Sequence, residues 1–187
     1  MERSRLPSLR PIFLTGLRLL ARASGVMIAR NGIAPVLVGG GAAEFYSGSA
    51  ITTGDFDLVT ARQPEFEQVL RELGFTKPEG LGHTPLGWIH PDLQLGFEVV
   101  SSTLLDGLAD RDRVMQVAAE PDGVAAIISV EDMIADRMGQ YASGTAPEML
   151  AQARILFALH PDCDQVYLAR RVFEETGGDY GIPDLCS

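Results

Sequence analysis

The sequence contains little cysteine and little histidine. Its 187 residues include two cysteines and three histidines, and neither residue type occurs at the paired spacing of a zinc site. Cys163 and Cys186 are also too few and too far apart for the disulfide framework of a small secreted protein. We therefore expect free thiols and a cytoplasmic protein.

A long apolar segment without charge is also missing. A membrane-spanning helix needs about 20 consecutive apolar residues, and the one candidate, 12–28, contains Arg18 and Arg22. The same arginines do not fit the apolar region of a signal peptide. We interpret the segment as a helix of a globular protein and expect no membrane contact, with an arginine-rich transit peptide as the alternative.

Basic residues are scarce outside the N-terminal region. The net charge is −10, and residues 1–31 hold six arginines and one acid, whereas residues 32–187 hold nine basic residues and 24 acids. Lysine and arginine supply most of the non-specific affinity for nucleic acid. We therefore expect no extended nucleic-acid binding by the acidic part, and the N-terminal arginines are either a solvated helix face or a local RNA contact.

Two common nucleotide-binding motifs are absent, although a glycine-rich segment is present. Residues 36–38 are apolar and residues 39–41 are three glycines, which predicts a buried strand followed by a glycine turn. No Gly-Lys-Ser/Thr follows, which excludes a P-loop. The spacing Gly39-x-Gly41-x-x-Glu44 lacks the third glycine of a dinucleotide-binding turn.

Two acids at alternating positions follow in a predicted strand. Asp55 and Asp57 alternate with Phe56 and Leu58. Because side chains alternate across a strand, the two carboxylates point to one face and the apolar side chains point to the other. Magnesium prefers oxygen ligands and binds through one or two carboxylates together with substrate phosphates. The pattern predicts a divalent-cation site and the chemistry of phosphoryl or nucleotidyl transfer.

A third acid lies in a later predicted strand. Glu98 stands among the apolar residues of 96–100, and an unpaired carboxylate is costly to bury in such a strand. It either joins the two aspartates at a polar site or faces water from an edge strand.

The periodicity of the chain predicts an α+β fold, in which a small mixed β-sheet is flanked by helices and the C-terminal half is helical. We expect two domains. Residues 1–128 form an α/β core that includes an N-terminal helix, and residues 129–187 form a helical C-terminal subdomain that packs on the core. Helices are predicted at 9–30, 41–47, 64–73, 130–142, 147–159 and 164–176, strands at 35–38, 54–60, 86–90, 93–100, 114–118 and 124–129, and a loop at 76–85.

The glycine-rich segment and the acidic strand together resemble those of the nucleotidyltransferase superfamily with the DNA polymerase beta-like fold. The resemblance is to its small prokaryotic members and the related abortive-infection-type toxins, and it covers about 10–175. It rests on the strand that ends at Gly39-Gly40, the Asp-x-Asp strand at 53–58, a later acid, and a helix start at 129–138. It implies a nucleotidyltransferase core.

The resemblance also implies roles for particular residues. The three acids match catalytic metal ligands for Mg²⁺, with Mn²⁺ possible, and the nucleotide is held by the glycines and two polar side chains. The implied catalytic and metal residues are Asp55, Asp57 and Glu98, and the implied nucleotide-binding residues are Gly39, Gly40, Gly41, Thr53 and Arg137.

The sequence departs from the family pattern in three features. Gly40 stands where many active members have serine, Ala50 and Ile51 stand where an arginine often precedes the Thr-x-Asp segment, and Arg137 replaces a common lysine. Backbone amides can hold phosphate without the serine, whereas arginine preserves the charge of lysine but not its geometry.

The resemblance implies transfer of a nucleoside monophosphate from a nucleoside triphosphate to an acceptor. The acceptor is a protein, an RNA end or a small molecule, and the resemblance to abortive-infection-type toxins implies a toxin-antitoxin setting. The alternative from a different class is a catalytically degenerate member that serves as a binding module or antitoxin-type partner. Convergence of Glu98 with the two aspartates favours the enzyme, and its absence favours the binding module.

Overall fold

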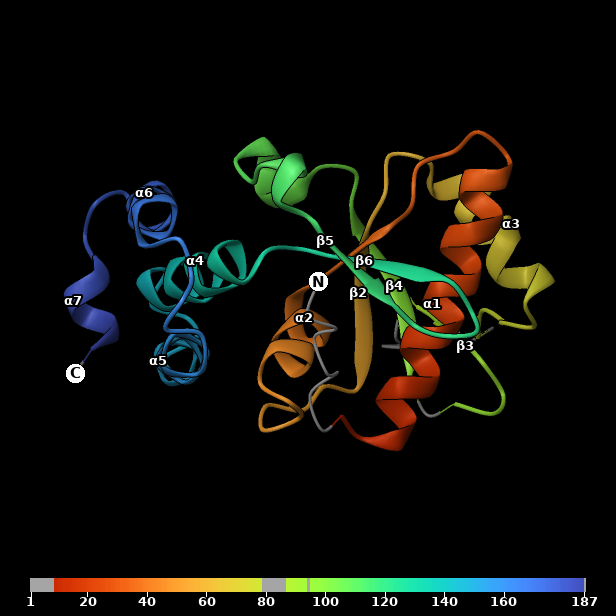
Figure 1. Cartoon of the computed structure of the whole chain (residues 1–187), viewed down its shortest axis with the longest axis horizontal. Coiled ribbons are helices and arrows are strands. Elements are labelled where there is room, and N and C mark those ends of the chain that lie inside the picture. Colours follow the sequence, from red (N-terminus) through yellow and green to blue (C-terminus); the bar gives the residue numbers. More distant parts are fainter. Residues whose placement is uncertain (1–8, 79–86, 94, 187) are drawn as a thin grey trace.

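The computed structural model describes residues 9–78, 87–93 and 95–186. Within these ranges the chain forms a six-stranded mixed sheet with helices on both sides and further helices at the C-terminal end (Figure 1). The predicted α+β fold is confirmed. The helices are α1 (Pro11–Ala29), α2 (Gly39–Tyr46), α3 (Gln63–Glu72), α4 (Val130–Ala142), α5 (Met149–Leu159), α6 (Gln165–Thr176) and α7 (Ile182–Leu185), the 3₁₀ helices are η1 (Leu104–Gly107) and η2 (Arg111–Arg113), and the strands are β1 (Val36–Val38), β2 (Asp55–Val59), β3 (Trp88–Ile89), β4 (Gly96–Ser101), β5 (Met115–Ala118) and β6 (Val124–Ile127).

The order of strands in the sheet is β3-β4-β2-β1-β6-β5. Strand β1 pairs antiparallel with β2 and parallel with β6, and β2 pairs parallel with β4. The register places Val38, the last residue of β1, opposite Asp57, and places Asp57 opposite Glu98. The end of β1 and the acids of β2 and β4 therefore lie side by side.

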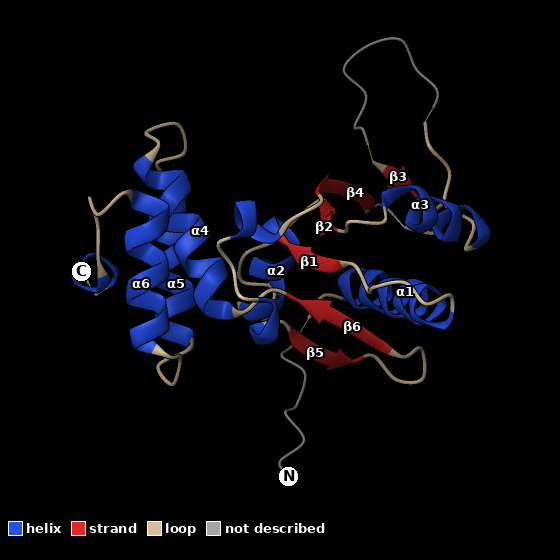
Figure 2. Cartoon of the chain, turned by 90° about the horizontal axis from the view of Figure 1, so that it is seen from above, coloured by secondary structure: helices blue, strands red, loops and turns tan. Residues whose placement is uncertain are grey.

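The two faces of the sheet carry different side chains. Phe56 of β2 stacks on Phe97 of β4 with ring centroids 5.0 Å apart, and Phe13 of α1 packs against Phe56 at 4.9 Å. Helices α1 and α3 lie together on this apolar face, and α2 lies on the other side (Figure 2). Because side chains alternate along a strand, the acids of β2 and β4 face the side of α2.

Helix α1 is long and apolar enough to cross a membrane by length and composition alone. Its apolar side is occupied by the core, since Phe13, Leu17 and Leu20 are buried. Gly16 lies so close to Phe56 that an added Cβ would come within 2.9 Å of the ring. A buried core helix meets the same criterion, and packing on the sheet accounts for the buried apolar residues of α1.

The C-terminal helices α5 and α6 both pack on α4, which follows directly from β6. The predicted cap of α4 is present: Ser129 Oγ accepts a hydrogen bond from the Asp132 N–H at 3.1 Å. His160 at the end of α5 connects these helices to α2, because its Nε2 lies 2.9 Å from the carbonyl oxygen of Tyr46. The boundary between the two predicted domains at 128 and 129 stays a prediction.

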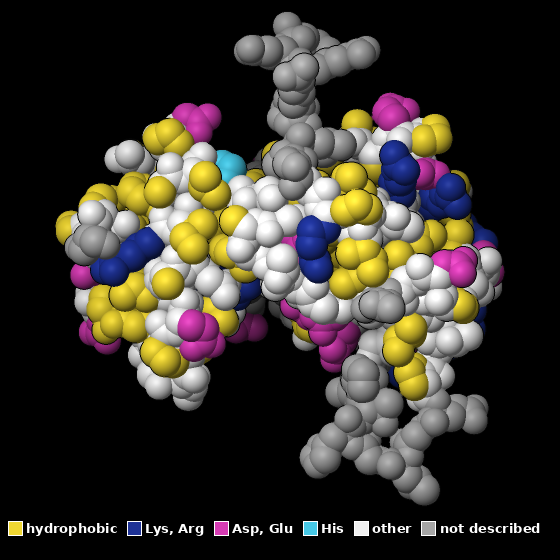
Figure 3. Space-filling view, turned by 90° about the horizontal axis from the view of Figure 1, so that it is seen from below, with side chains coloured by type: hydrophobic (Ala, Val, Ile, Leu, Met, Phe, Trp, Pro, Cys, Tyr) yellow, Lys and Arg dark blue, Asp and Glu magenta, His cyan; other side chains and the backbone are white. Residues whose placement is uncertain are grey.

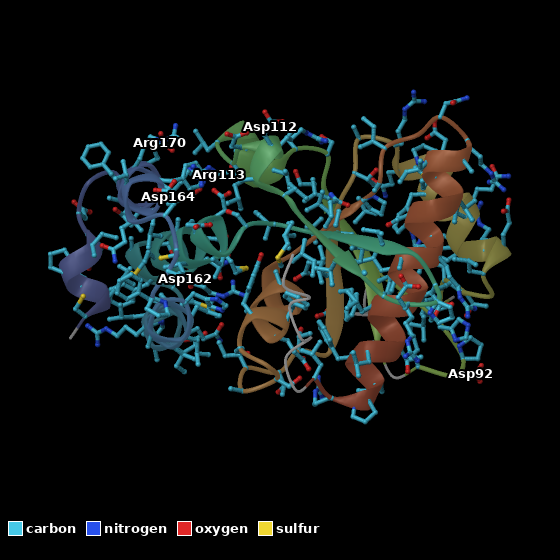
Figure 4. All side chains as sticks on the ribbon, viewed as in Figure 1. Asp92, Asp112, Arg113, Asp162, Asp164 and Arg170 are labelled. Atoms are coloured by element: carbon cyan, nitrogen blue, oxygen red, sulfur yellow. The ribbon has the colours of Figure 1, made fainter. Side chains whose placement is uncertain are left out.

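A second contact joins the helices to the rest of the chain where η2 meets α6. Arg113 lies over the ring of Tyr167, 3.8 Å from its centroid, and pairs with Asp164 at 2.7 Å. Arg170 approaches the same ring at 5.0 Å. Figure 4 shows Arg113, Asp164 and Arg170 gathered at this junction.

The structure differs from the sequence prediction in several local features. Residues 39–41 form the first turn of α2, which begins at Gly39 instead of 41. The short elements α7, η1 and η2 were not predicted, because elements of three or four residues carry no clear periodicity. The predicted hairpin is present as β3 and β4. Leu86 and Gln94 of the two predicted strands, and 79–85 of the predicted loop, lie outside the described residues.

Candidate active site

Three carboxylates converge on the face of the sheet that carries α2. Asp55 and Asp57 lie two residues apart on β2, and Glu98 lies beside Asp57 on the parallel strand β4. Each offers an oxygen atom, and these atoms all lie within 4.8 Å of one another. Asp55 is exposed, while Asp57 and Glu98 are partly buried. The structure thus brings together the three acids that the sequence analysis singled out.

The environment of Asp57 favours a bound cation. Burial raises the pKa of Asp57, and the negative charges of Asp55 and Glu98 raise it further, while a hydrogen bond from the Gly40 N–H and the charge of Arg137 lower it. Three acids held this close repel one another when ionised. A hard divalent cation prefers oxygen ligands and would relieve that repulsion, so the donor set fits such a cation.

The first turn of α2 faces these carboxylates. Helix N-termini leave backbone N–H groups without intrahelical partners, which suits them to bind anions such as phosphate. Gly39 adopts a left-handed conformation with φ of 56°, and a Cβ there would overlap the Asp57 carboxylate. Glycine at this position therefore lets the helix begin directly against the acidic cluster.

We expect Gly39→Ala to damage the site selectively. The methyl group would displace the Asp57 carboxylate, and the left-handed backbone would cost about 1–2 kcal/mol of stability. Metal affinity measured by calorimetry should fall. The control is Gly25→Ala in α1, where nothing lies within 4 Å of the added Cβ, and this change should stabilise the helix by about 0.5–1 kcal/mol. Unchanged metal binding in Gly39→Ala would contradict the proposed fit.

Thr53 lies between α2 and the acidic strand. Its hydroxyl Oγ1 is 3.3 Å from Oδ1 of Asp55, and a Cβ on Gly40 would come within 2.6 Å of the same hydroxyl. A serine at 40 would therefore crowd Thr53. The hydroxyl of Thr53 fills the space beside the glycine turn, which gives a physical reason for glycine at 40. Gly41 instead faces the core, where a Cβ would approach Leu37 Cδ1 at 2.7 Å.

Arg137 reaches toward the site from α4. Its side chain is only 5% exposed, and its Nη1 donates to Asp136 Oδ2 at 3.0 Å. Its Nε has no partner within the described residues. Burial lowers the pKa of Arg137, while the charges of Asp136 and Asp57 raise it. A buried guanidinium with an unused donor is suited to bind an anion, because such a donor is costly to leave without a partner.

Sequence reasoning missed two residues next to the site. Glu44 is a fully buried acid in α2 and pairs with Arg10, which lies just before α1. Arg10 Nη2 also donates to the carbonyl oxygen of Thr53 at 2.9 Å. An arginine thus reaches the Thr-x-Asp segment from a remote part of the chain, although none stands directly before it. The one local signal was a lone glutamate among the apolar residues of 42–46.

A small pocket adjoins the acidic cluster. It has a volume of about 310 Å³. Two of the three acids line it, together with apolar residues and glycines. On the face shown in Figure 3, acidic side chains gather beside the notch between the sheet-containing part and the C-terminal helices. The lining residues are Gly54, Asp55, Gly87, Ile89, Leu95, Gly96 and Glu98.

Solved structures show a similar fold. An antigenic nucleotidyltransferase-like protein from Paracoccidioides brasiliensis is 16% identical, with a TM-score of 0.59, and the match covers 96% of this chain and 93% of that one. The antibiotic-resistance factor ANT(2'')-Ia is 19% identical, with a TM-score of 0.51, and the match covers 87% and 90%. No family model and no curated protein matches the sequence. This protein therefore has the nucleotidyltransferase fold, as its sequence predicts.

Proposed function

We propose that this protein is a metal-dependent nucleotidyltransferase that transfers a nucleoside monophosphate from a nucleoside triphosphate to an acceptor. The observation that carries the proposal is the convergence of Asp55, Asp57 and Glu98 beside the N-terminus of α2. Convergence of the third acid also favours an enzyme over a degenerate binding module. The nucleotidyltransferase fold supports the same assignment.

The three acids would hold Mg²⁺, or Mn²⁺ in its place. When bound, the metal neutralises phosphate charge and stabilises the charge that develops during transfer. Asp57 and Glu98 lie opposite each other on paired strands, so both are held on a rigid part of the sheet. Their positions are set by the ladder of hydrogen bonds and do not depend on a loop.

The phosphates would lie against the first turn of α2. The backbone N–H groups of 39–41 offer donors at the positive end of the helix. Arg137 adds a buried positive charge from the C-terminal helices, and Thr53 adds a hydroxyl beside Asp55. These groups would orient the triphosphate so that its α-phosphorus lies near the acidic cluster.

The transfer forms a bond between the acceptor oxygen and the α-phosphorus and breaks the bond to the leaving pyrophosphate. Glu98, partly buried beside Asp57, would accept the proton of the acceptor hydroxyl. Positioning and charge neutralisation would provide most of the acceleration, because the reacting groups are already close and oriented.

The acceptor would be a small molecule with a hydroxyl group. A pocket of about 310 Å³ beside Asp55 and Glu98 supports this choice, because ligand pockets begin at about 300 Å³. Repulsion from the acidic part of the chain also disfavours a long nucleic acid. We propose that the reaction takes place in the cytoplasm.

The proposal is tested by calorimetry with the four ribonucleoside triphosphates in the presence and absence of magnesium. One triphosphate should bind to the parent only when magnesium is present, and the double variant Asp55→Asn, Asp57→Asn should not bind it. The matched control is Asp92→Asn, Asp112→Asn, which removes two exposed aspartates away from the cluster (Figure 4). Absence of binding to any triphosphate would favour the non-catalytic binding module.

A further inference from the structure

An ion pair with one fully buried member links the start of α1 to the segment that leads into the acidic strand. Arg10 donates to both carboxylate oxygens of Glu44, with Nε–Oε1 and Nη2–Oε2 distances of 2.7 Å. Glu44 is fully buried within α2, while the Arg10 side chain is 37% exposed. Such a bidentate pair fixes orientation as well as charge. The two residues are 34 positions apart in the sequence, so the pair joins the start of α1 to α2.

The same pair holds both backbone groups of Thr53. Glu44 Oε2 accepts a hydrogen bond from the Thr53 N–H at 2.8 Å, and Arg10 Nη2 donates to the Thr53 carbonyl oxygen at 2.9 Å. Ser49 contributes twice, since its Oγ donates to Glu44 Oε1 at 2.9 Å and accepts from the Arg10 N–H at 3.0 Å. The loop between α2 and β2 is therefore fastened near both of its ends.

The Glu44 carboxylate is fully provided with donors. Burial raises its pKa, but hydrogen bonds from Arg10, from the Thr53 N–H and from Ser49 lower the pKa by more, so that it lies below the usual value. The carboxylate is therefore ionised at neutral pH. A buried charge of this kind holds its partners firmly, because the loss of any one donor leaves it incompletely compensated.

Thr53 passes this restraint to the acidic cluster. Its hydroxyl lies 3.3 Å from Oδ1 of Asp55 and packs against Gly40 in the first turn of α2. Asp55 is the exposed member of the cluster and stands at the start of β2, where the strand itself restrains it least. The position of its carboxylate therefore depends on the loop before it.

We propose that Arg10 and Glu44 are positioning residues of the metal site. They hold the backbone of Thr53 so that the Asp55 carboxylate and the Thr53 hydroxyl stay beside the first turn of α2. Neither residue belongs to the acidic cluster itself, and their effect on it passes through Thr53. The inference rests on the proposed metal-dependent function of the cluster.

The test uses Arg10→Lys and Glu44→Gln with Mn²⁺ alone as the probe, its binding followed by electron paramagnetic resonance. Lysine keeps the charge but cannot bind Glu44 and Thr53 together, so Mn²⁺ affinity should fall by roughly 10- to 100-fold, as for other residues that orient metal ligands. Glu44→Gln should weaken binding in the same direction. The control is Arg30→Lys, because Arg30 lies just after α1 and forms an exposed bidentate pair with Glu72. The Mn²⁺ affinity of Arg30→Lys should equal that of the parent.

Amide hydrogen exchange separates positioning from general loss of stability. In Arg10→Lys, exchange should accelerate at Thr53 and Asp55, whereas Leu58 in the same strand should keep its protection. Mn²⁺ binding as tight as in the parent, or acceleration at Leu58 equal to that at Thr53, would overturn the inference while leaving the proposed function intact. A parent protein that binds no Mn²⁺ would overturn the proposed function and the inference with it.

Discussion

Asp57→Asn should abolish nucleotide transfer while the protein remains folded. Asp57 lies at the centre of the acidic cluster, opposite Glu98 on one side and Val38 on the other. Changes to residues that only support a metal ligand cost about 10- to 100-fold, so we expect a larger loss for a residue that supplies a ligand itself. The measurement is the initial rate of pyrophosphate release with the triphosphate that calorimetry identifies.

The stability of Asp57→Asn should not fall with its activity. The pKa of Asp57 is raised in the folded protein by burial and by Asp55. The folded state then binds the proton more tightly than the unfolded state, so the free energy of unfolding falls as the pH rises through that range. At neutral pH the ionised side chain costs stability, and Asp57→Asn should melt at an equal or higher temperature than the metal-free parent.

Magnesium and a control variant complete this test. Ligand that binds only the folded state raises the melting temperature, so magnesium should stabilise the parent but not Asp57→Asn. Asp92→Asn, which changes an exposed aspartate in the turn before β4, should behave as the parent in both assays. Full transfer activity in Asp57→Asn would remove Asp57 from the proposed mechanism.

The acidic cluster could be predicted because its geometry is local. Alternation along one strand placed Asp55 and Asp57 on one face and Phe56 on the other, and the structure has this arrangement. Glu98 could be named from its apolar neighbours alone. Its position next to Asp57 depends on the register between β2 and β4, which no local pattern in either strand specifies.

The support of the site could not be predicted because it is non-local. The contact between Arg10 and Glu44 depends on how α1 and α2 pack on opposite sides of the sheet. The N-terminal arginines were expected to form a solvated face or an RNA contact, and those within the described residues make different contacts. Arg10 pairs with the buried Glu44, whereas Arg22 contacts Asp122 in the β5–β6 turn at 2.5 Å. Charge composition gives no information on such individual pairings.

The start of α2 illustrates a different limit. Three consecutive glycines are poor helix formers, so the sequence predicts a turn before the helix. In the structure the helix begins at Gly39, and its first two residues pack so closely against Asp57 and Thr53 that no Cβ atom fits there. Tertiary contacts override intrinsic propensity here, and they do so at the candidate site.

Arg171→Met should cause the largest loss of stability among these variants. Arg171 is completely buried in α6, and its Nε donates to Asp132 Oδ1 of α4 at 2.7 Å. Its two other nitrogens pair with Glu174 at 2.7 Å and Glu175 at 2.5 Å. Methionine would leave the buried Asp132 carboxylate without its cation, which costs about 3–5 kcal/mol when one member of a buried pair is removed. Urea unfolding measures the change.

The neighbouring arginine provides the matched control for this prediction. Arg170 is 56% exposed, and its pair with Glu174 is 3.6 Å long; exposed pairs contribute at most about 1 kcal/mol. Arg170→Met should therefore change the free energy of unfolding by less than that amount. Adding Asp132→Asn to Arg171→Met should restore part of the lost stability, because the uncompensated charge is removed. Equal losses in Arg171→Met and Arg170→Met would show that the buried pair does not hold α4 and α6 together.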